Sequence, residues 1–263
     1  MTTALEFLGG EHLERGRWRF DVGRELHGAF GGAFGGVVAA IAVMSGRDRA
    51  DGRRPMALDC RFVRGLAAGP ASVATEVISS GRSLTNVSVR ITGADDRLAC
   101  AATVSYVDDD AIRHDISRAG MPVRSMPELK SPADVRPWSS PPGLEIPMLT
   151  TFEPRGIGRG DFGVATAMTV PWSMDDSVAA ETACLAADLC VGPPVDLAIE
   201  GDFVPHPNPD VSIRFVDPQP SPMSVGIGRL ELIESGVASV SIEVWTDEQL
   251  AAIGSCSALF MPG

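Results

Sequence analysis

The sequence is poor in lysine and has no long apolar run, and each shortage excludes a class of protein. Lys130 is the single lysine, which excludes a phosphate-binding P-loop, or a Schiff-base lysine elsewhere in the chain. No apolar stretch approaches the roughly 18 residues that a membrane-spanning helix needs. The first residues, MTTALEFLGGEHLERG, are acidic and lack the apolar length of a secretory signal. We therefore expect a cytoplasmic protein that has no membrane partner.

The sequence also lacks the cysteine patterns of disulfide and metal frameworks. Its cysteines form an odd set without a C-x-x-C pair, at positions 60, 100, 184, 190 and 256. Such a set suits a reducing cytosol and supplies neither a disulfide framework nor a zinc site. We expect no metal and no redox cofactor, because no cluster of ligand residues is present.

Acidic residues outnumber basic residues, and the formal net charge is −12 at pH 7. A protein this acidic has no overall charge with which to neutralise phosphates, so we expect no nucleic acid or anionic lipid as partner. An anionic ligand would need a local basic cluster, and the six arginines between positions 47 and 64 are a candidate. The alternative for the first four of them is a solvated loop that leads into a strand.

Two parts of the sequence resemble each other. A strand-like run ends in Arg61-Phe62-Val63, and a second one ends in Arg214-Phe215-Val216. Further strand-like runs follow at nearly the same offset, with 87–91 matching 240–244 and 98–100 matching 250–252. The common spacing of about 153 residues indicates an internal duplication.

Both halves also follow one plan of elements. In the first half we predict a strand at 18–22, a helix at 33–44, and strands at 56–64, 71–80, 83–92 and 97–107. In the second half we predict a strand at 162–170, a helix at 177–191, and strands at 211–217, 222–233, 236–245 and 249–260. Strands that follow one another without intervening helices favour an antiparallel sheet and the α+β class.

The predicted helix of the first half, AFGGVVAAIAVM, is apolar on all sides, so we expect it to be buried. Its small residues would let a sheet curl tightly around it, which is the hotdog arrangement. Eight prolines and no clear periodicity mark residues 111–158 as a linker, with room for one strand near its end. We therefore predict a double hotdog, with one hotdog at 1–110, a proline-rich linker at 111–158 and a second hotdog at 159–263.

Several short motifs resemble a known family by their order and spacing. They are Phe34-Gly35-Gly36-Val37, Arg61-Phe62-Val63-Arg64-Gly65, Ser80-Gly81-Arg82-Ser83, and in the second half the segments 185–189 and 208–215. They resemble the type II acyl-CoA thioesterases and related thioesterase-like proteins, which are double-hotdog proteins. The resemblance covers nearly the whole chain outside the linker. It implies hydrolysis of acyl-CoA to a free acid and CoA, with acyl-CoA as partner and no cofactor.

The resemblance also implies a catalytic set. The family positions a nucleophilic water with an aspartate, a hydroxyl residue and a glutamine. By position these fall on Asp188, Asn208 and Cys256, so one of the three residue types matches. The Asn208 amide both donates and accepts hydrogen bonds and can hold a water, whereas a thiol hydrogen-bonds weakly. A register shift of one residue would bring Ser255 or Ser257 to the third position.

Asp188 stands near the end of a helix that Gly192-Pro193-Pro194 is expected to stop. A carboxylate there faces the negative end of the helix dipole, so helix stability does not explain it. If Asp188 is partly buried, its pKa should rise, which suits a general base. The alternative is that Glu181 and Asp188, seven residues apart on one face, form a solvent-exposed stripe.

Other motif residues are assigned to substrate binding. Gly35 and Gly36 open the first helix, where backbone N–H groups can polarise a thioester carbonyl and glycine allows close approach. The alternative for these glycines is close packing between helix and sheet. Arg82 is a candidate contact to a phosphate of CoA or to its pantetheine arm, with a plain turn arginine as the alternative. Arg64 and Ser83, from the same motifs, are assigned to the substrate with it.

A second function stays open. The protein could bind acyl-CoA, or act on it as a hydratase, with little hydrolysis. Asp202 and His206 resemble the Asp/His pair of hotdog enoyl-CoA hydratases, but their spacing is one residue short and they follow the helix. A purely structural module would leave the helix aspartate without a role. The sequence leaves the acyl chain length and the formation of a homo-oligomer open.

Overall fold

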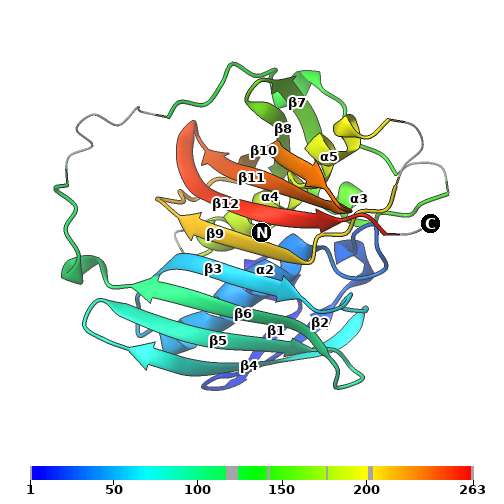
Figure 1. The fold of residues 1–263 in the computed structure, drawn as a ribbon. Helices are drawn as coiled ribbons and strands as arrows, with labels where there is room; N and C mark the ends of the chain where they lie inside the picture. Colours follow the sequence, from blue (N-terminus) through cyan, green and yellow to red (C-terminus); the bar gives the residue numbers. More distant parts are fainter. Residues whose placement is uncertain (1, 117–123, 141–142, 176, 201–203, 262–263) are drawn as a thin grey trace.

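The computed structural model describes residues 2–116, 124–140, 143–175, 177–200 and 204–261. Across these ranges, twelve strands form one antiparallel sheet in the order β1-β2-β4-β5-β6-β3-β9-β12-β11-β10-β8-β7 (Figure 1). The two main helices, α2 and α4, lie behind the strands in this view, on the concave side of the sheet.

The first half contributes one end of this sheet and its helix. Its strands are β1 (Gly10–Glu14), β2 (Arg17–Val22), β3 (Arg54–Phe62), β4 (Gly69–Ser80), β5 (Leu84–Thr92) and β6 (Leu98–Val107), and its main helix is α2 (Gly35–Gly46). Buried and partly exposed residues alternate along β5, because one face of the strand packs on α2 and the other faces outward.

The second half repeats the arrangement. Its strands are β7 (Arg155–Gly160), β8 (Gly163–Thr169), β9 (Asp210–Phe215), β10 (Met223–Glu234), β11 (Val237–Thr246) and β12 (Gln249–Leu259), and its main helix is α4 (Ala179–Leu189). β10 and β11 are joined by Ser235-Gly236, both with positive φ, which is the backbone of a tight hairpin turn.

Short helices complete the described chain. The α-helices are α1 (Ala4–Phe7), α3 (Met148–Phe152) and α5 (Gly192–Ala198), and the 3₁₀ turns are η1 (Arg24–Leu26), η2 (Arg47–Arg49), η3 (Asp109–Ala111) and η4 (Pro132–Asp134). In the described residues, no helix combines the length and the hydropathy needed to cross a membrane.

The two halves meet edge to edge along β3 and β9. These strands pair in antiparallel fashion, with Leu58 opposite Ile213 and Cys60 opposite Val211. The repeated Arg-Phe motif therefore marks the same strand in each half, and these two strands, β3 and β9, lie side by side in Figure 1. Each half covers an edge of the other that would otherwise expose unpaired backbone groups.

The two main helices also pack on each other, and they run in opposite directions. Gly36, in the first turn of α2, lies against the last two turns of α4, and Arg47 beyond the end of α2 reaches Glu181 near the start of α4. A Cβ atom on Gly36 would lie 2.7 Å from the Leu185 Cα, so only glycine permits this approach. The packing brings the start of α2 to the end of α4.

The α+β class and the antiparallel double hotdog expected from the sequence are confirmed. The two sheets are continuous through the β3–β9 pair. Gly192-Pro193-Pro194 does end α4, but the same residues begin α5, because proline is tolerated in the first turn of a helix. The predicted linker also supplies α3 and most of β7. The division at 1–110, 111–158 and 159–263 stays a prediction.

Candidate active site

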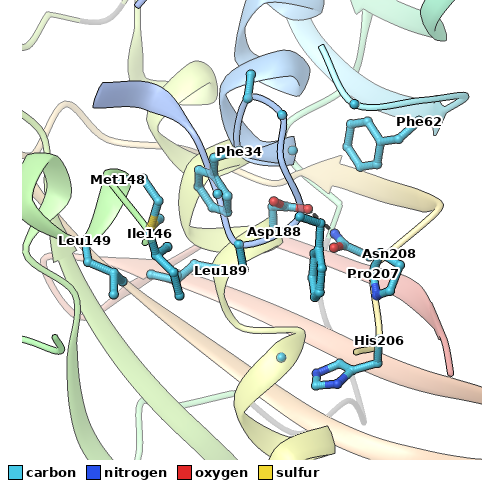
Figure 2. A pocket seen from close by; sticks show the side chains of 18 of the residues that line it. Phe34, Phe62, Ile146, Met148, Leu149, Asp188, Leu189, His206, Pro207 and Asn208 are labelled. Carbon is cyan, nitrogen blue, oxygen red and sulfur yellow. Dashed lines mark hydrogen bonds between the residues drawn. The ribbon is translucent and has the colours of Figure 1, made fainter. Parts of the chain in front are cut away.

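A cavity of about 820 Å³ opens where the start of α2, the end of α4 and the segment before β9 meet. Figure 2 shows Phe34, Ile146, Met148, Leu149 and Leu189 on one side of Asp188, with Phe62, His206, Pro207 and Asn208 on the other. The apolar lining comes from both halves and from the proline-rich segment, and includes Phe34, Phe62, Trp138, Leu144, Ile146, Met148, Leu149, Leu189 and Leu197.

Asp188 is the central polar residue of the cavity, and its side chain is held from two directions. Its Oδ2 accepts a hydrogen bond of 2.8 Å from the Gly36 N–H at the start of α2. Its Oδ1 accepts a hydrogen bond from the Asn208 amide, in the segment before β9. A Cβ atom on Gly35 would lie 2.8 Å from both carboxylate oxygens, so a larger residue there would displace the carboxylate. Asp188 therefore has a fixed position at the wall of the cavity.

The surroundings of Asp188 set its protonation. The residue is 5% exposed, and this burial raises the pKa of its carboxyl to about 7, although the hydrogen bonds from Gly36 and Asn208 act in the opposite direction. A carboxylate with that pKa is partly ionised near neutral pH. It can therefore accept a proton and release it again, as the sequence-based argument for a general base requires.

Glu181 is buried as well, and it belongs to a separate ion pair. Its carboxylate accepts two hydrogen bonds from the Arg47 guanidinium, at 2.7 and 2.9 Å. Neither Glu181 nor Asp188 faces solvent, so the alternative of an exposed acidic stripe is wrong. The reason is that α4 is buried between α2 and the sheet, a contact that the sequence of α4 alone does not reveal.

Cys256 lies on β12, behind Asn208 and outside the lining of the cavity. Its thiol donates a hydrogen bond to the Asp210 carbonyl. Burial raises the pKa of this thiol, and a hydrogen bond with Asn208 offsets part of the rise. Ser257 donates its backbone N–H to the Asp210 carboxylate, and Ser255 lines a hollow elsewhere, with Arg214 and Arg229. Neither serine lines the cavity.

The remaining predicted binding residues fall into two groups. Gly35 and Arg64 line the same cavity as Asp188, and Gly36 donates its backbone N–H to the Asp188 carboxylate. Arg82 and Ser83 lie in the turn between β4 and β5 and do not line the cavity. The Arg82 carbonyl accepts a hydrogen bond from Arg53, which follows the far end of α2. The helix thus separates this turn from the cavity.

Part of the cavity wall was not predicted from the sequence. Ile146, Met148 and Leu149 come from the predicted linker, where an apolar cluster among the prolines was the available signal. Asp196 was also missed; its Oδ1 lies 3.6 Å from the Nε2 of His206, and both residues line the cavity. The other member of the Asp/His motif, Asp202, lies outside the described residues.

No set of three or more His, Cys, Asp or Glu side chains in the described ranges is arranged to hold a metal ion. The polar side chains that line the cavity are those of Asp188, Asn208, Arg64, Ser139 and the Asp196–His206 pair. An antiparallel sheet wrapped around two opposed helices defines a double-hotdog protein.

The comparisons with known proteins make this class more specific. Residues 24–107 match the family model described as acyl-CoA thioesterase N-terminal domain. The first half of the chain thus resembles an acyl-CoA thioesterase domain, and the resemblance drawn from the sequence motifs is confirmed. No curated protein matched the chain.

Solved structures with the same fold cover almost the whole chain. A hot dog fold protein from Alicyclobacillus acidocaldarius has a TM-score of 0.79 and 20% identity, with 100% of each chain covered. An acyl-CoA thioesterase II from Mycobacterium marinum has a TM-score of 0.77 and 16% identity, with 98% of each chain covered. A tesB protein from Mycobacterium avium subs paratuberculosis has a TM-score of 0.76 and 17% identity, with 98% of each chain covered. At these identities the likeness shows the fold.

Proposed function

We propose that this protein hydrolyses acyl-CoA thioesters to a free acid and CoA, with a water molecule activated by Asp188. The observation that carries the proposal is the buried Asp188 carboxylate, whose pKa is raised to about 7 at the wall of an apolar cavity. The acyl-CoA thioesterase domain at residues 24–107 supports thioester hydrolysis as the reaction class.

The reaction would begin with a proton transfer from water to ionised Asp188. The hydroxide so formed adds to the thioester carbonyl and gives a tetrahedral intermediate with a negatively charged oxygen. The first N–H groups of an α-helix have no intrahelical acceptor, and they stabilise such an oxyanion. The Gly36 N–H already binds Asp188, so we assign the oxyanion to the Gly35 N–H. When the intermediate collapses, the carbon–sulfur bond breaks, and the CoA sulfur takes the proton that Asp188 received from water, so that Asp188 is ionised again.

Asn208 would orient the water. Its amide nitrogen donates to Asp188, which leaves its carbonyl oxygen as an acceptor for a water O–H. Cys256 lies behind Asn208 and donates to the Asp210 carbonyl, so it contributes no group to the water. Because one orienting group is missing, we expect slow turnover on straight-chain acyl-CoAs with binding intact.

The apolar wall supports an acyl chain as the other part of the substrate. The side chains of Phe34, Ile146, Met148 and Leu149 gather on one side of Asp188 (Figure 2). Burial of each methylene of an acyl chain against such a wall contributes about 0.8 kcal/mol to binding. Affinity should therefore rise with chain length until the cavity of about 820 Å³ is filled.

The second candidate function is binding of acyl-CoA, or hydration of an unsaturated acyl-CoA, without efficient hydrolysis. Asn208 and Cys256 favour it, since they replace the hydroxyl and amide residues of the family's catalytic set. The difference lies in whether the thioester bond is broken.

A thiol-release assay across saturated acyl-CoAs of increasing length separates the candidates. We expect CoA release by the wild-type protein and a fall of at least about 100-fold in kcat for Asp188→Asn, with substrate binding retained. Binding without release would support the second candidate. Equal release by wild type and Asp188→Asn would move the catalytic site away from this cavity.

A further inference from the structure

Arg64 brings a positive charge to the cavity without a carboxylate partner. It lines the cavity, and its buried Nε has no hydrogen-bond partner in the described residues. No carboxylate of those residues lies within 4.0 Å of its guanidinium, whereas thirteen other arginines form such ion pairs. In a chain with a net charge of −12, an arginine that lines an apolar cavity without a carboxylate partner is available to an anionic ligand.

The backbone around Arg64 is held by hydrogen bonds to β6 and to the residue just before α2. The Arg64 N–H donates to the Ala99 carbonyl on β6 at 3.3 Å, and the Leu66 carbonyl accepts from the Ala33 N–H, just before α2, at 2.7 Å. Leu66 itself is buried. A side chain whose backbone is fixed on both sides loses less conformational freedom when it binds a ligand.

Arg64 is also the cavity residue whose chemistry fits an anion. The Asp188 and Asp196 carboxylates would repel one, and His206 lies beside Asp196. A guanidinium group presents several N–H donors in one plane and binds two oxygens of a carboxylate or phosphate at once.

We propose that Arg64 binds an anionic oxygen group of the substrate, either a phosphate of CoA or a carboxylate at the far end of the acyl chain. The inference rests on the proposed function, because it places a CoA thioester in this cavity. If the group is a carboxylate, the preferred substrates are acyl-CoAs that end in a second carboxylate. If it is a phosphate, Arg64 recognises the CoA carrier and leaves the acyl group free to vary.

The test compares wild type, Arg64→Met, Arg64→Lys and the control Arg90→Met, whose arginine is exposed on β5. The substrates are hexanoyl-CoA, adipoyl-CoA, which has the same chain length and a terminal carboxylate, and hexanoyl-pantetheine, which has no phosphate. A phosphate contact predicts that Arg64→Met raises KM for hexanoyl-CoA about tenfold or more and leaves hexanoyl-pantetheine unchanged. A carboxylate contact predicts a similar loss of kcat/KM for adipoyl-CoA alone.

Arg64→Lys keeps the positive charge but loses the planar guanidinium that binds two oxygens at once, so we expect an intermediate loss of kcat/KM. This variant replaces Arg64→Met in the comparison if Arg64→Met does not fold. The inference is overturned if Arg64→Met behaves like Arg90→Met on all three substrates. If the wild type hydrolyses none of them, the proposed function fails, and calorimetric binding of CoA and adipoyl-CoA decides the inference. Binding that is weakened in Arg64→Met and not in Arg90→Met supports it, and equal binding by all the proteins contradicts it.

Discussion

At the scale of single residues, Asp188 combines burial with two hydrogen bonds, and its raised pKa has consequences for the rate. The base form is needed to accept a proton from water, and it is lost as the pH falls through about 7. We expect kcat/KM of the wild type to rise from pH 5 to a plateau above about pH 8, with an apparent pKa near 7. The prediction is tested by measuring rates between pH 5 and pH 8, both at saturating and at low substrate concentration. A flat profile would contradict a general base of this pKa.

The same pKa predicts how stability changes with pH. The folded protein holds the Asp188 proton up to about pH 7, whereas the unfolded chain releases it near the ordinary pKa of 3.8. The stabilising contribution of the protonated form is therefore complete below about pH 3.8 and is lost progressively as the pH rises to about 7. The variant Asp188→Asn does not titrate at this position, so it does not lose stability in this way as the pH rises.

At pH 8 we expect Asp188→Asn to have a free energy of unfolding a few kcal/mol higher than wild type, because each tenfold change in proton affinity corresponds to about 1.4 kcal/mol. The variant should therefore unfold at a higher temperature. The difference should be small at pH 4, because the folded wild type is then neutral at this position, as the variant is. Thermal unfolding at the two pH values measures it. A variant that is less stable than wild type at pH 8 would assign Asp188 a structural role.

Asn208 and Cys256 carry a prediction about rate. The Asn208 amide donates a hydrogen bond to the Asp188 carboxylate, and the Cys256 thiol contacts Asn208. The double change Asn208→Thr with Cys256→Gln should raise kcat well above either single change, because the hydroxyl and the amide would act on one water and couple. Kinetics of the four proteins form the test. High activity of the unaltered protein that the double change lowers would show that the family's catalytic set does not apply, and Ser255 and Ser257 would be tested next.

At the scale of elements, α2 and α4 are joined at both ends. Gly36 and Asp188 meet at one end, and Arg47 and Glu181 form a largely buried ion pair at the other. Removal of one charge leaves the other uncompensated, so Glu181→Gln should lower the free energy of unfolding by about 3 kcal/mol. Glu231→Gln breaks an exposed ion pair with Arg229 and should change the free energy of unfolding by less than about 1 kcal/mol. Urea unfolding of both variants makes the comparison, and equal effects would contradict the burial argument.

The close approach of the two helices also fixes what residue 36 can be. In Gly36→Ala, the new Cβ would meet the Leu185 Cα at 2.7 Å and the Cys184 carbonyl at 3.0 Å, both backbone atoms. The helices must separate, and the Gly36–Asp188 hydrogen bond must lengthen. We expect kcat to fall about tenfold or more. In the control Gly81→Ala, the new Cβ is 3.9 Å from its nearest neighbour, and kcat should be unchanged.

At the scale of the whole molecule, the β3–β9 pair makes the two halves one structure. Each half alone would expose the edge of β3 or β9 and the helix surface that the other half covers. We expect residues 1–115 and 150–263 to be insoluble when expressed separately and to recover on co-expression. Solubility and gel filtration measure this, and a monomeric half that melts cooperatively would contradict it.

Several features of the fold follow from local sequence alone. Alternating apolar residues, tight turns and an all-apolar helix predicted β2 to β6 and α2 to within a few residues. The same signals identified β8 to β12 and α4. β1 and α5 were not predicted, because β1 is short and largely exposed and α5 begins with Gly192-Pro193-Pro194, which also stop the preceding helix. Local patterns show where a helix ends and say little about whether another begins.

The sequence by itself determined most of the elements, their repetition in two halves and the candidacy of Asp188, because these depend on periodicity, spacing and short motifs. Only the tertiary structure decided which side chains meet. It brought Asp188, Asn208, Gly35 and Arg64 to one cavity and left Arg82 outside it. It also made the proline-rich segment part of the cavity wall. The physical reason is that contact and burial depend on how one curved sheet closes around two opposed helices, and no single stretch of sequence contains that geometry.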